Sequence, residues 1–171
     1  MALTAAADKP TPVSSAAALE KTANQAKPGD IISVAAGQHD GWKARIDCAG
    51  TEDHPVVIRP KTSNAVTFSG TTKLELTGSH TVMQGFRFDE CELKATPLAL
   101  NGARHCRVTD CHFANITKGP SPSYAALWIQ NKAADNRVDH CSFSNIAGRS
   151  VQVRIRSKDD LPLRNRIDHN L

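Results

Sequence analysis

The chain has 171 residues, of which 40% are hydrophobic and 22% charged, so it can form one domain with a sizeable core and is neither disordered nor membrane-like. Aromatic residues account for only 5%, which argues against a stacking surface for single-stranded nucleic acid. Most of the net charge of +4 lies in residues 149–171, where six basic side chains accompany three acidic ones. This stretch either meets a polyanion or is a solvated face; we expect neither nucleic acid nor a membrane as partner.

The first residues predict a flexible segment followed by a capping helix. Residues 1–13 are expected to be flexible, and Met1–Pro10 lacks the apolar stretch of a signal peptide. A helix is predicted over residues 14–27, with Ser14 or Ser15 as its N-cap. One side of this helix is small and apolar, through Ala16, Leu19, Ala23 and Ala26.

After the helix, the chain is a series of short apolar segments with the alternation of β-strands. In chain order they are residues 31–34, 56–58, 66–68, 73–76, 82–88, 106–116, 127–130, 136–146, 151–155 and 165–171. Three of them share residue identities, namely Cys106-Arg-Val-Thr-Asp-Cys-His-Phe113, Asn136-Arg-Val-Asp-His-Cys-Ser-Phe143 and Asn165-Arg-Ile-Asp-His-Asn170. One apolar position per repeat gives separations of 26, 25, 25, 30 and 29 residues along Ile32, Ile58, Met83, Val108, Val138 and Ile167.

A repeat of this length without a helical pattern cannot bury its apolar side alone, whereas stacked repeats can. The sequence therefore predicts an all-β fold, a right-handed parallel β-helix of about six turns over residues 14–171, with residues 14–27 as its capping helix. A β-sandwich would not repeat residue identities at a fixed period. Stacking predicts two inward columns, an aliphatic one of Val108, Val138 and Ile167 and an aromatic one of Phe88, Phe113 and Phe143.

The C-terminal end of this solenoid is predicted to be uncapped, because the chain stops at Leu171 inside a copy of the repeat. We expect the chain to be the front part of a longer solenoid. Its exposed last turn would then offer a surface for self-association.

The cysteines and histidines suggest a metal site that the repeat explains differently. Five cysteines without a Cys-x-x-Cys spacing predict buried free thiols. A zinc reading would use Cys106, Cys111, His112, His140 and Cys141, but these residues are copies of one bend, so no metal site is expected. The dipeptides Asp139-His140 and Asp168-His169 either act as acid–base pairs or hydrogen-bond a repeated turn, and their repetition favours the turn. The insertion Lys118–Ser123 either lines a binding face or is a plain loop.

With these motifs, the chain resembles polysaccharide lyase family six, the chondroitinase-B-like and alginate lyases. The pieces that carry the resemblance, from about residue 15 onward, are Lys27–Ala35 with Gly37, Pro55–Ile58, Phe68–Gly70, Val82–Phe88, Asn136–Phe143 and Asn165–Asn170. Members cleave acidic polysaccharides by β-elimination: a Lys takes the proton next to the uronate carboxylate, an Arg assists as acid, and Ca²⁺ neutralises the carboxylate.

The resemblance places that Lys, the Arg and the calcium ligands beyond Leu171. It therefore assigns no catalytic residue and no cofactor to this chain, and Ca²⁺ is expected in the full-length family member. The resemblance implies the N-terminal part of a secreted or periplasmic lyase for alginate or a related uronate polymer, inactive by itself. The alternatives are a non-catalytic module that binds acidic glycan and a structural solenoid.

A substrate site is predicted on one sheet of the solenoid. If Val151, Val153 and Ile155 point inward, then Gln152, Arg154 and Arg156 point outward. One turn earlier, inward Leu127 and Ile129 place Trp128 and Gln130 on the outer face. An indole for sugar stacking then lies beside guanidinium groups for uronate carboxylates. The predicted substrate-binding residues are Trp128, Gln130, Gln152, Arg154, Arg156 and Lys158. The alternative is an exposed strand whose arginines pair with Asp159 and Asp160.

Overall fold

The computed structural model describes the chain except residues 1–10, 93, 95, 118 and 120–123. Part of the expected flexible segment and most of the insertion Lys118–Ser123 therefore lie outside the described residues. The elements are β1 (Thr11–Val13), α1 (Ala16–Ala23), β2 (Ile31–Val34), β3 (Gly37–Asp40), β4 (Lys43–Ile46), β5 (Val56–Pro60), β6 (Val66–Gly70), β7 (Lys73–Leu76), β8 (Thr81–Gln84), β9 (Arg87–Cys91), β10 (Leu98–Asn101), β11 (Arg107–Thr109), β12 (His112–Ile116), β13 (Ala125–Gln130), β14 (Arg137–Asp139), β15 (Ser142–Ile146), β16 (Arg149–Val153) and β17 (Arg166–Asp168).

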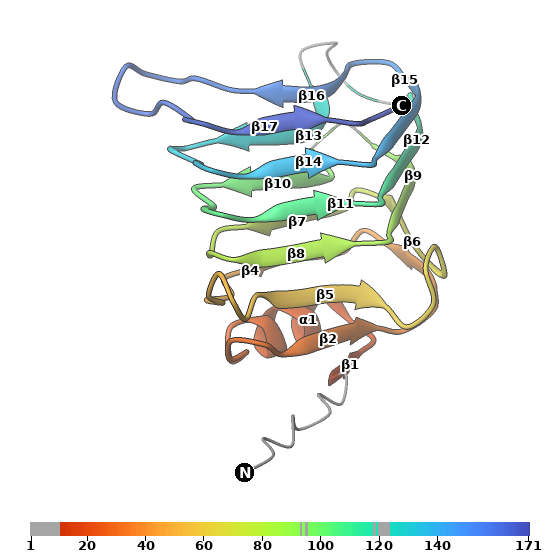
Figure 1. Cartoon of the computed structure of the whole chain (residues 1–171). Helices are drawn as coiled ribbons and strands as arrows, with labels where there is room; N and C mark the ends of the chain where they lie inside the picture. The colour runs from red at the N-terminus through yellow and green to blue at the C-terminus, as the bar shows by residue number, and fades with distance from the viewer. Residues whose placement is uncertain (1–10, 93, 95, 118, 120–123) are drawn as a thin grey trace.

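The strands form three parallel sheets that wind around one core (Figure 1). Sheet A has the order β1-β2-β5-β8-β11-β14-β17, sheet B β15-β12-β9-β6-β3 and sheet C β16-β13-β10-β7-β4. Each turn contributes one strand to each sheet, so β2 to β16 make five complete turns and β17 begins a sixth. The predicted parallel β-helix is confirmed, and five complete turns with the start of a sixth agree with the expected number of about six.

The strand register confirms the predicted columns of stacked side chains. Ile32, Ile58, Met83, Val108, Val138 and Ile167 pair from strand to strand along sheet A. Phe88, Phe113 and Phe143 pair along sheet B, with ring centroids 4.7 and 4.9 Å apart, and Phe68 extends this column. One sequence period is therefore one turn of the solenoid, because parallel strands bring equivalent positions about 4.8 Å apart.

The corners between sheets explain the repeated polar residues. Asp110, His140 and His169 each have a φ of 53°, the left-handed conformation that Asp, Asn and His adopt more readily than other side chains. The rings of His140 and His169 stack 5.5 Å apart. At the corner that leads from sheet C into sheet A, the Asn136 side chain accepts from the Cys106 N–H at 2.9 Å and donates to the Asn165 side chain at 2.8 Å.

All five cysteines are free and buried, as predicted, and burial raises the pKa of Cys48 and Cys91 to about 12. Among the described residues, no three side chains of His, Cys, Asp or Glu gather where they could hold a metal ion. Within the same residues, no helix has the length and apolar character needed to cross a bilayer.

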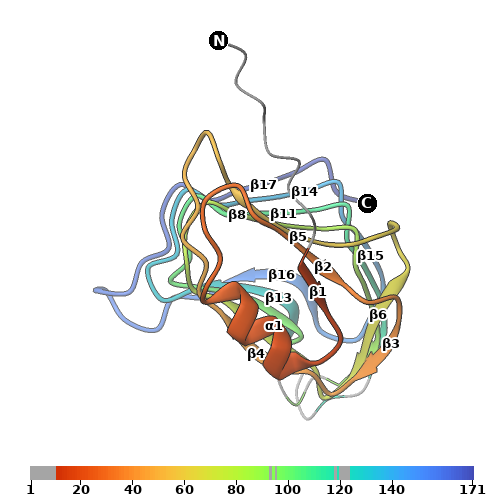
Figure 2. The ribbon, with the colours of Figure 1, turned by 90° about the horizontal axis from the view of Figure 1, so that it is seen from below.

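The N-terminal end is covered by α1 and β1 (Figure 2). Ser15 is the N-cap and accepts from the Ala18 N–H at 3.2 Å. The helix is shorter than predicted, because it ends at Ala23 with Asn24 as C-cap. The residues Thr11–Val13, expected to be flexible, pair with β2 and extend sheet A.

Candidate functional site

The outer face of sheet C carries a column that includes a half-buried aromatic side chain. Arg45, Glu75, Ala99, Trp128 and Gln152 are in register on successive strands. Within β13, the flanking Leu127 and Ile129 are completely buried, while Trp128 is half-buried. Because the preceding position, Ala99, is only a methyl group, the surface is hollow beside the indole.

Two adjoining hollows surround Trp128. One has a volume of about 270 Å³ and is lined by Lys73, Glu75, Lys94, Thr96, Ala99, Tyr124, Trp128, Arg154 and Arg156. The other has a volume of about 330 Å³ and is lined by Tyr124, Trp128, Arg149, Gln152 and Arg154. Since they share Tyr124, Trp128 and Arg154, we treat them as one feature, the Trp128 groove.

Trp128 is fixed in place by three neighbours. Its indole N–H donates to the Gln152 side-chain oxygen at 3.1 Å. The Tyr124 ring stacks against it with centroids 5.9 Å apart, and the Arg154 guanidinium carbon lies 4.5 Å from the centroid of the Trp128 ring. A cation at this distance is attracted to the indole face, so the arginine and the ring form one preorganised unit.

The charge of the groove is predominantly positive. Lys73 is neutralised by Glu75 at 3.0 Å, and Lys94 by Glu92 at 2.8 Å. The hydrogen bond that the Lys94 ammonium donates to the Glu92 carboxylate raises the pKa of Lys94. Within the described part of the chain, neither Arg154 nor Arg156 forms an ion pair, and the alternative pairing with Asp159 and Asp160 is not observed. Two guanidinium groups therefore face the groove without a carboxylate.

The structure brings four of the six predicted substrate-binding residues together, namely Trp128, Gln152, Arg154 and Arg156. Gln130 is not among them. Its side chain, expected to point outward, is only 4% exposed. The physical reason is that β13 ends at Gln130 and the chain turns over through Asn131 and Lys132, both with positive φ.

Lys158 also lies apart from the groove. It lines a different hollow with Arg104 and Lys132, because β16 ends at Val153 and the chain then loops out before β17. Val153 is in register with the buried Ile129, as the alternation predicts, and is 44% exposed because no further turn covers it. Ile155, expected to point inward, lies beyond the end of β16 and is 60% exposed.

Sequence reasoning missed the residues that earlier turns contribute. Lys73 and Glu75 lie on β7, two strands below Trp128 in sheet C, and counting back two periods would have found them. Tyr124 follows the insertion, where the period is broken, so no sequence signal placed it against the indole.

The arrangement suits binding rather than proton transfer. No histidine is among the described residues that line the Trp128 groove, and its one lining carboxylate, Glu75, is paired. The Asp–His pairs belong to the corners instead. Burial of Asp139 would raise its pKa, but hydrogen bonds from Arg107 and His140 outweigh burial and lower that pKa.

The described residues also do not fit the calcium ion that the family resemblance implies. Asp135, Asp139 and Asp168 are each engaged by arginine at 2.6 to 3.0 Å, and no acidic side chains cluster in the Trp128 groove beyond Glu75. A calcium site needs several converging oxygens.

Comparisons with known proteins agree with this fold. A mannuronic-acid-specific polysaccharide family 6 lyase from human gut microbiota superposes with a TM-score of 0.80 at 22% identity, over 94% of this chain and 39% of that chain. The PL6 family alginate lyase AlyGC gives 0.69 at 24% identity, over 79% of this chain and 19% of that chain. An alginate lyase from Paenibacillus sp. str. FPU-7 gives 0.68 at 18% identity, over 92% and 57%.

The chain thus spans between about a fifth and somewhat over a half of the length of these solved relatives. No curated protein matches it. The family model described as Chondroitinase B, however, matches residues 13–171, which is nearly the whole chain and includes every strand of the complete turns. On this match, the chain belongs to the chondroitinase B family of polysaccharide lyases.

Proposed function

We propose that the chain is the N-terminal part of a lyase acting on alginate or a related uronate polymer, and that the Trp128 groove binds a segment of that polymer. The observation that carries the proposal is the unit of Trp128 and Arg154, with Arg156 beside it and no carboxylate of a described residue paired to either arginine. A sugar ring stacks on an indole, and guanidinium binds a uronate carboxylate through two parallel hydrogen bonds.

The groove would bind the polymer without cleaving it. β-Elimination needs a base for the proton next to the uronate carboxylate and a cation to stabilise the developing negative charge. Both groove lysines, Lys73 and Lys94, are ion-paired with carboxylates, so neither is suited to act as the base. We infer that the base, the acid and the Ca²⁺ site come from outside the described residues, and that the isolated chain is inactive. A polymeric substrate of this kind also favours a secreted or periplasmic location.

Tryptophan fluorescence tests the binding step. Trp42 is only 9% exposed, so added trimannuronate should change the signal mainly through Trp128. Arg154→Ala is expected to weaken the affinity about tenfold, because one charge-assisted bidentate contact is lost. Lys158→Ala removes an equal charge outside the groove and should leave the affinity unchanged. Equal affinities for the wild-type chain and Arg154→Ala would contradict the proposal.

Absorbance of the unsaturated uronate product tests the inactivity. The isolated chain should give no product with or without Ca²⁺, while a longer protein that continues with a Lys and an Arg on further turns should be active. Calcium-dependent turnover by the isolated chain would contradict this part of the proposal. Binding without turnover in a natural protein that stops at Leu171 would favour a non-catalytic glycan-binding module.

A further inference from the structure

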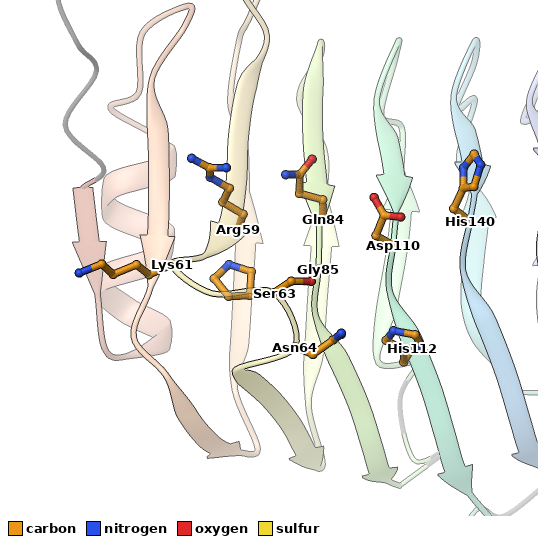
Figure 3. A pocket seen from close by; sticks show the side chains of 10 residues that line it. Arg59, Lys61, Ser63, Asn64, Gln84, Gly85, Asp110, His112 and His140 are labelled. Carbon is orange, nitrogen blue, oxygen red and sulfur yellow. The ribbon is translucent and has the colours of Figure 1, made fainter.

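A second polar cavity lies at the corner between sheets A and B, away from the Trp128 groove. It has a volume of about 330 Å³ and shares no lining residue with that groove. Figure 3 shows Arg59, Gln84, Asp110 and His140 in a row on successive turns, with Asn64 and His112 beside the middle of that row. We call it the corner cavity.

Backbone hydrogen bonds join the neighbouring segments that line the corner cavity. The turn after β5 folds onto the next turn of the solenoid, where the Asn64 N–H donates to the Gly85 carbonyl at 2.9 Å, and the Gly85 N–H donates to the Thr109 carbonyl at 3.3 Å. A methyl group added at Gly85 would lie 3.3 Å from the Ser63 hydroxyl oxygen. The close approach of these two segments fixes the cavity independently of any ligand.

Two cations and one amide that line the corner cavity lack side-chain partners among the described residues, whereas six arginines elsewhere are paired. Arg45, Arg87, Arg107, Arg137, Arg164 and Arg166 all pair with carboxylates. Arg59 and Lys61, in contrast, have no ion pair or side-chain hydrogen bond to any described residue, and the same holds for Gln84. His112 Nδ1 lies 2.7 Å from the Ser142 hydroxyl, and its Nε2 has no hydrogen-bond partner among the described residues.

The charges in the corner cavity are separated along the solenoid axis. The register places Arg59 and Gln84 on neighbouring strands, and Gln84 opposite Thr109, the residue before Asp110. Arg59 and Asp110 are thus two strand spacings apart, roughly 10 Å, with the neutral amide between them. A ligand that fits this pattern carries one carboxylate toward Arg59 and Lys61, and hydroxyl groups toward Gln84, Asp110 and His112 Nε2.

We propose that the corner cavity is a second binding site for an acidic sugar, with the uronate carboxylate held by Arg59 and Lys61 and the sugar hydroxyls held by Gln84, Asp110 and His112. The unpaired cations Arg59 and Lys61 are by themselves the reason to expect an anion at this site. The choice of a uronate sugar as that anion rests on the proposed function. The site would hold the polymer on a face other than the groove, so that one chain contacts two segments of polysaccharide.

Chemical-shift mapping of the ¹⁵N-labelled 171-residue chain with trimannuronate tests the proposal. We expect two separate sets of perturbed signals. The side-chain amides of Gln84 and Asn64 report the corner cavity, and the indole N–H of Trp128 reports the groove. The double variant Arg59→Gln/Lys61→Gln should weaken binding at the corner by about tenfold or more, without altering the response of Trp128.

The matched control is Arg104→Gln/Lys132→Gln, which removes the same two charges from exposed positions that line neither site. It should leave both sets of signals unchanged. Absence of perturbation at Gln84 and Asn64, or the same corner affinity in the double variant, would overturn the corner site while leaving the groove intact. Loss of the Trp128 response alone would instead refute the proposed groove.

Two further probes define the ligand. A neutral trisaccharide, maltotriose, should not bind at the corner; perturbation equal to that of trimannuronate would overturn the role of the carboxylate. Inorganic phosphate should bind more weakly than trimannuronate; equal or tighter binding of phosphate would overturn the assignment to a sugar.

Discussion

Ile32 and Ile167 occupy the same column of the solenoid, yet Ile32 is completely buried and Ile167 is 45% exposed. The two residues have the same side chain and the same strand position. What differs is the end of the stack at which they lie. Burial in a solenoid therefore depends on whether a neighbour covers each turn from both sides.

The N-terminal end is covered in two ways. Leu19 and Ala23 of α1 are completely buried against the first turn. In addition, the Glu20 carboxylate accepts from the Arg45 N–H at 2.9 Å, and the Asn24 side chain accepts from the Asp47 N–H at 3.1 Å. The helix thus supplies both apolar cover and acceptors for N–H groups along the edge at β4, which an open sheet would leave to water.

The C-terminal end has no equivalent cover among the described residues. Among the described residues, the most exposed large apolar side chains lie in its last turn and loop, namely Val153, Ile155, Leu161, Leu163, Ile167 and Leu171. The comparison teaches that core substitutions should cost less stability the closer they lie to this end.

The largest loss in the free energy of unfolding is expected for a substitution in the aromatic column of sheet B. Phe113 is completely buried, whereas Phe143, next along the column, is half-buried. Phe113→Ala should lower the free energy of unfolding by about 3–5 kcal/mol, and Phe143→Ala by clearly less. Urea denaturation measures both; equal losses would contradict the gradient along the stack.

The two ends themselves can be compared by truncating one apolar side chain at each. Leu19→Ala removes buried cover from the first turn and should cost about 2–5 kcal/mol. Ile167→Ala removes a side chain that is already 45% exposed and should cost about 1 kcal/mol. If Ile167→Ala were as destabilising as Leu19→Ala in the same denaturation experiment, the last turn would have to be covered in solution.

Substitutions in the ion pairs on sheet A should lower the free energy of unfolding by an intermediate amount. Arg107 holds the shielded carboxylate of Asp139 at 2.6 Å, whereas Arg166, with its side chain 65% exposed, pairs with Asp168 at 2.7 Å. Arg107→Gln should cost about 1–3 kcal/mol, since Asp139 loses a charged donor. Arg166→Gln should cost about 0–1 kcal/mol. Similar losses for the two variants would argue against a difference between interior and end pairs.

The same Asp139 makes stability depend on pH. Its pKa is lower in the folded chain than its ordinary value of 3.8, so its contribution to stability is present above that value and is lost as the pH falls toward the folded pKa. Thermal melts between pH 7 and pH 3 should therefore show destabilisation below about pH 4. The drop should be smaller in Arg107→Gln; an identical drop would assign the pH dependence to other carboxylates.

The smallest effect on folding is expected from surface charges placed on the open end. If that end drives self-association, Leu163→Lys and Ile167→Lys should shift the chain toward the monomer in sedimentation velocity, and Ile167→Lys should lower the stability by no more than about 1 kcal/mol, the loss expected for Ile167→Ala. Thr62→Lys adds the same charge at an exposed position of the second turn and should not change association. A monomeric wild-type chain at high concentration would remove the open end as an association surface.

The sequence by itself determined the repeat and everything that follows from its period. The spacing of Val108, Val138 and Ile167 predicts a register that the sheet confirms, because parallel stacking requires each residue to lie over its copy. The outward positions of Trp128, Gln152 and Arg154 follow from the same alternation.

Only the tertiary structure decided what happens where strands end and turns meet. Alternation predicts an outward Gln130, but the strand stops there and the following turn buries it. The Trp128 groove and the corner cavity both combine residues from different turns. Their shape depends on loops such as the one after β5, whose paths are set by packing and backbone hydrogen bonds rather than by a period in the sequence.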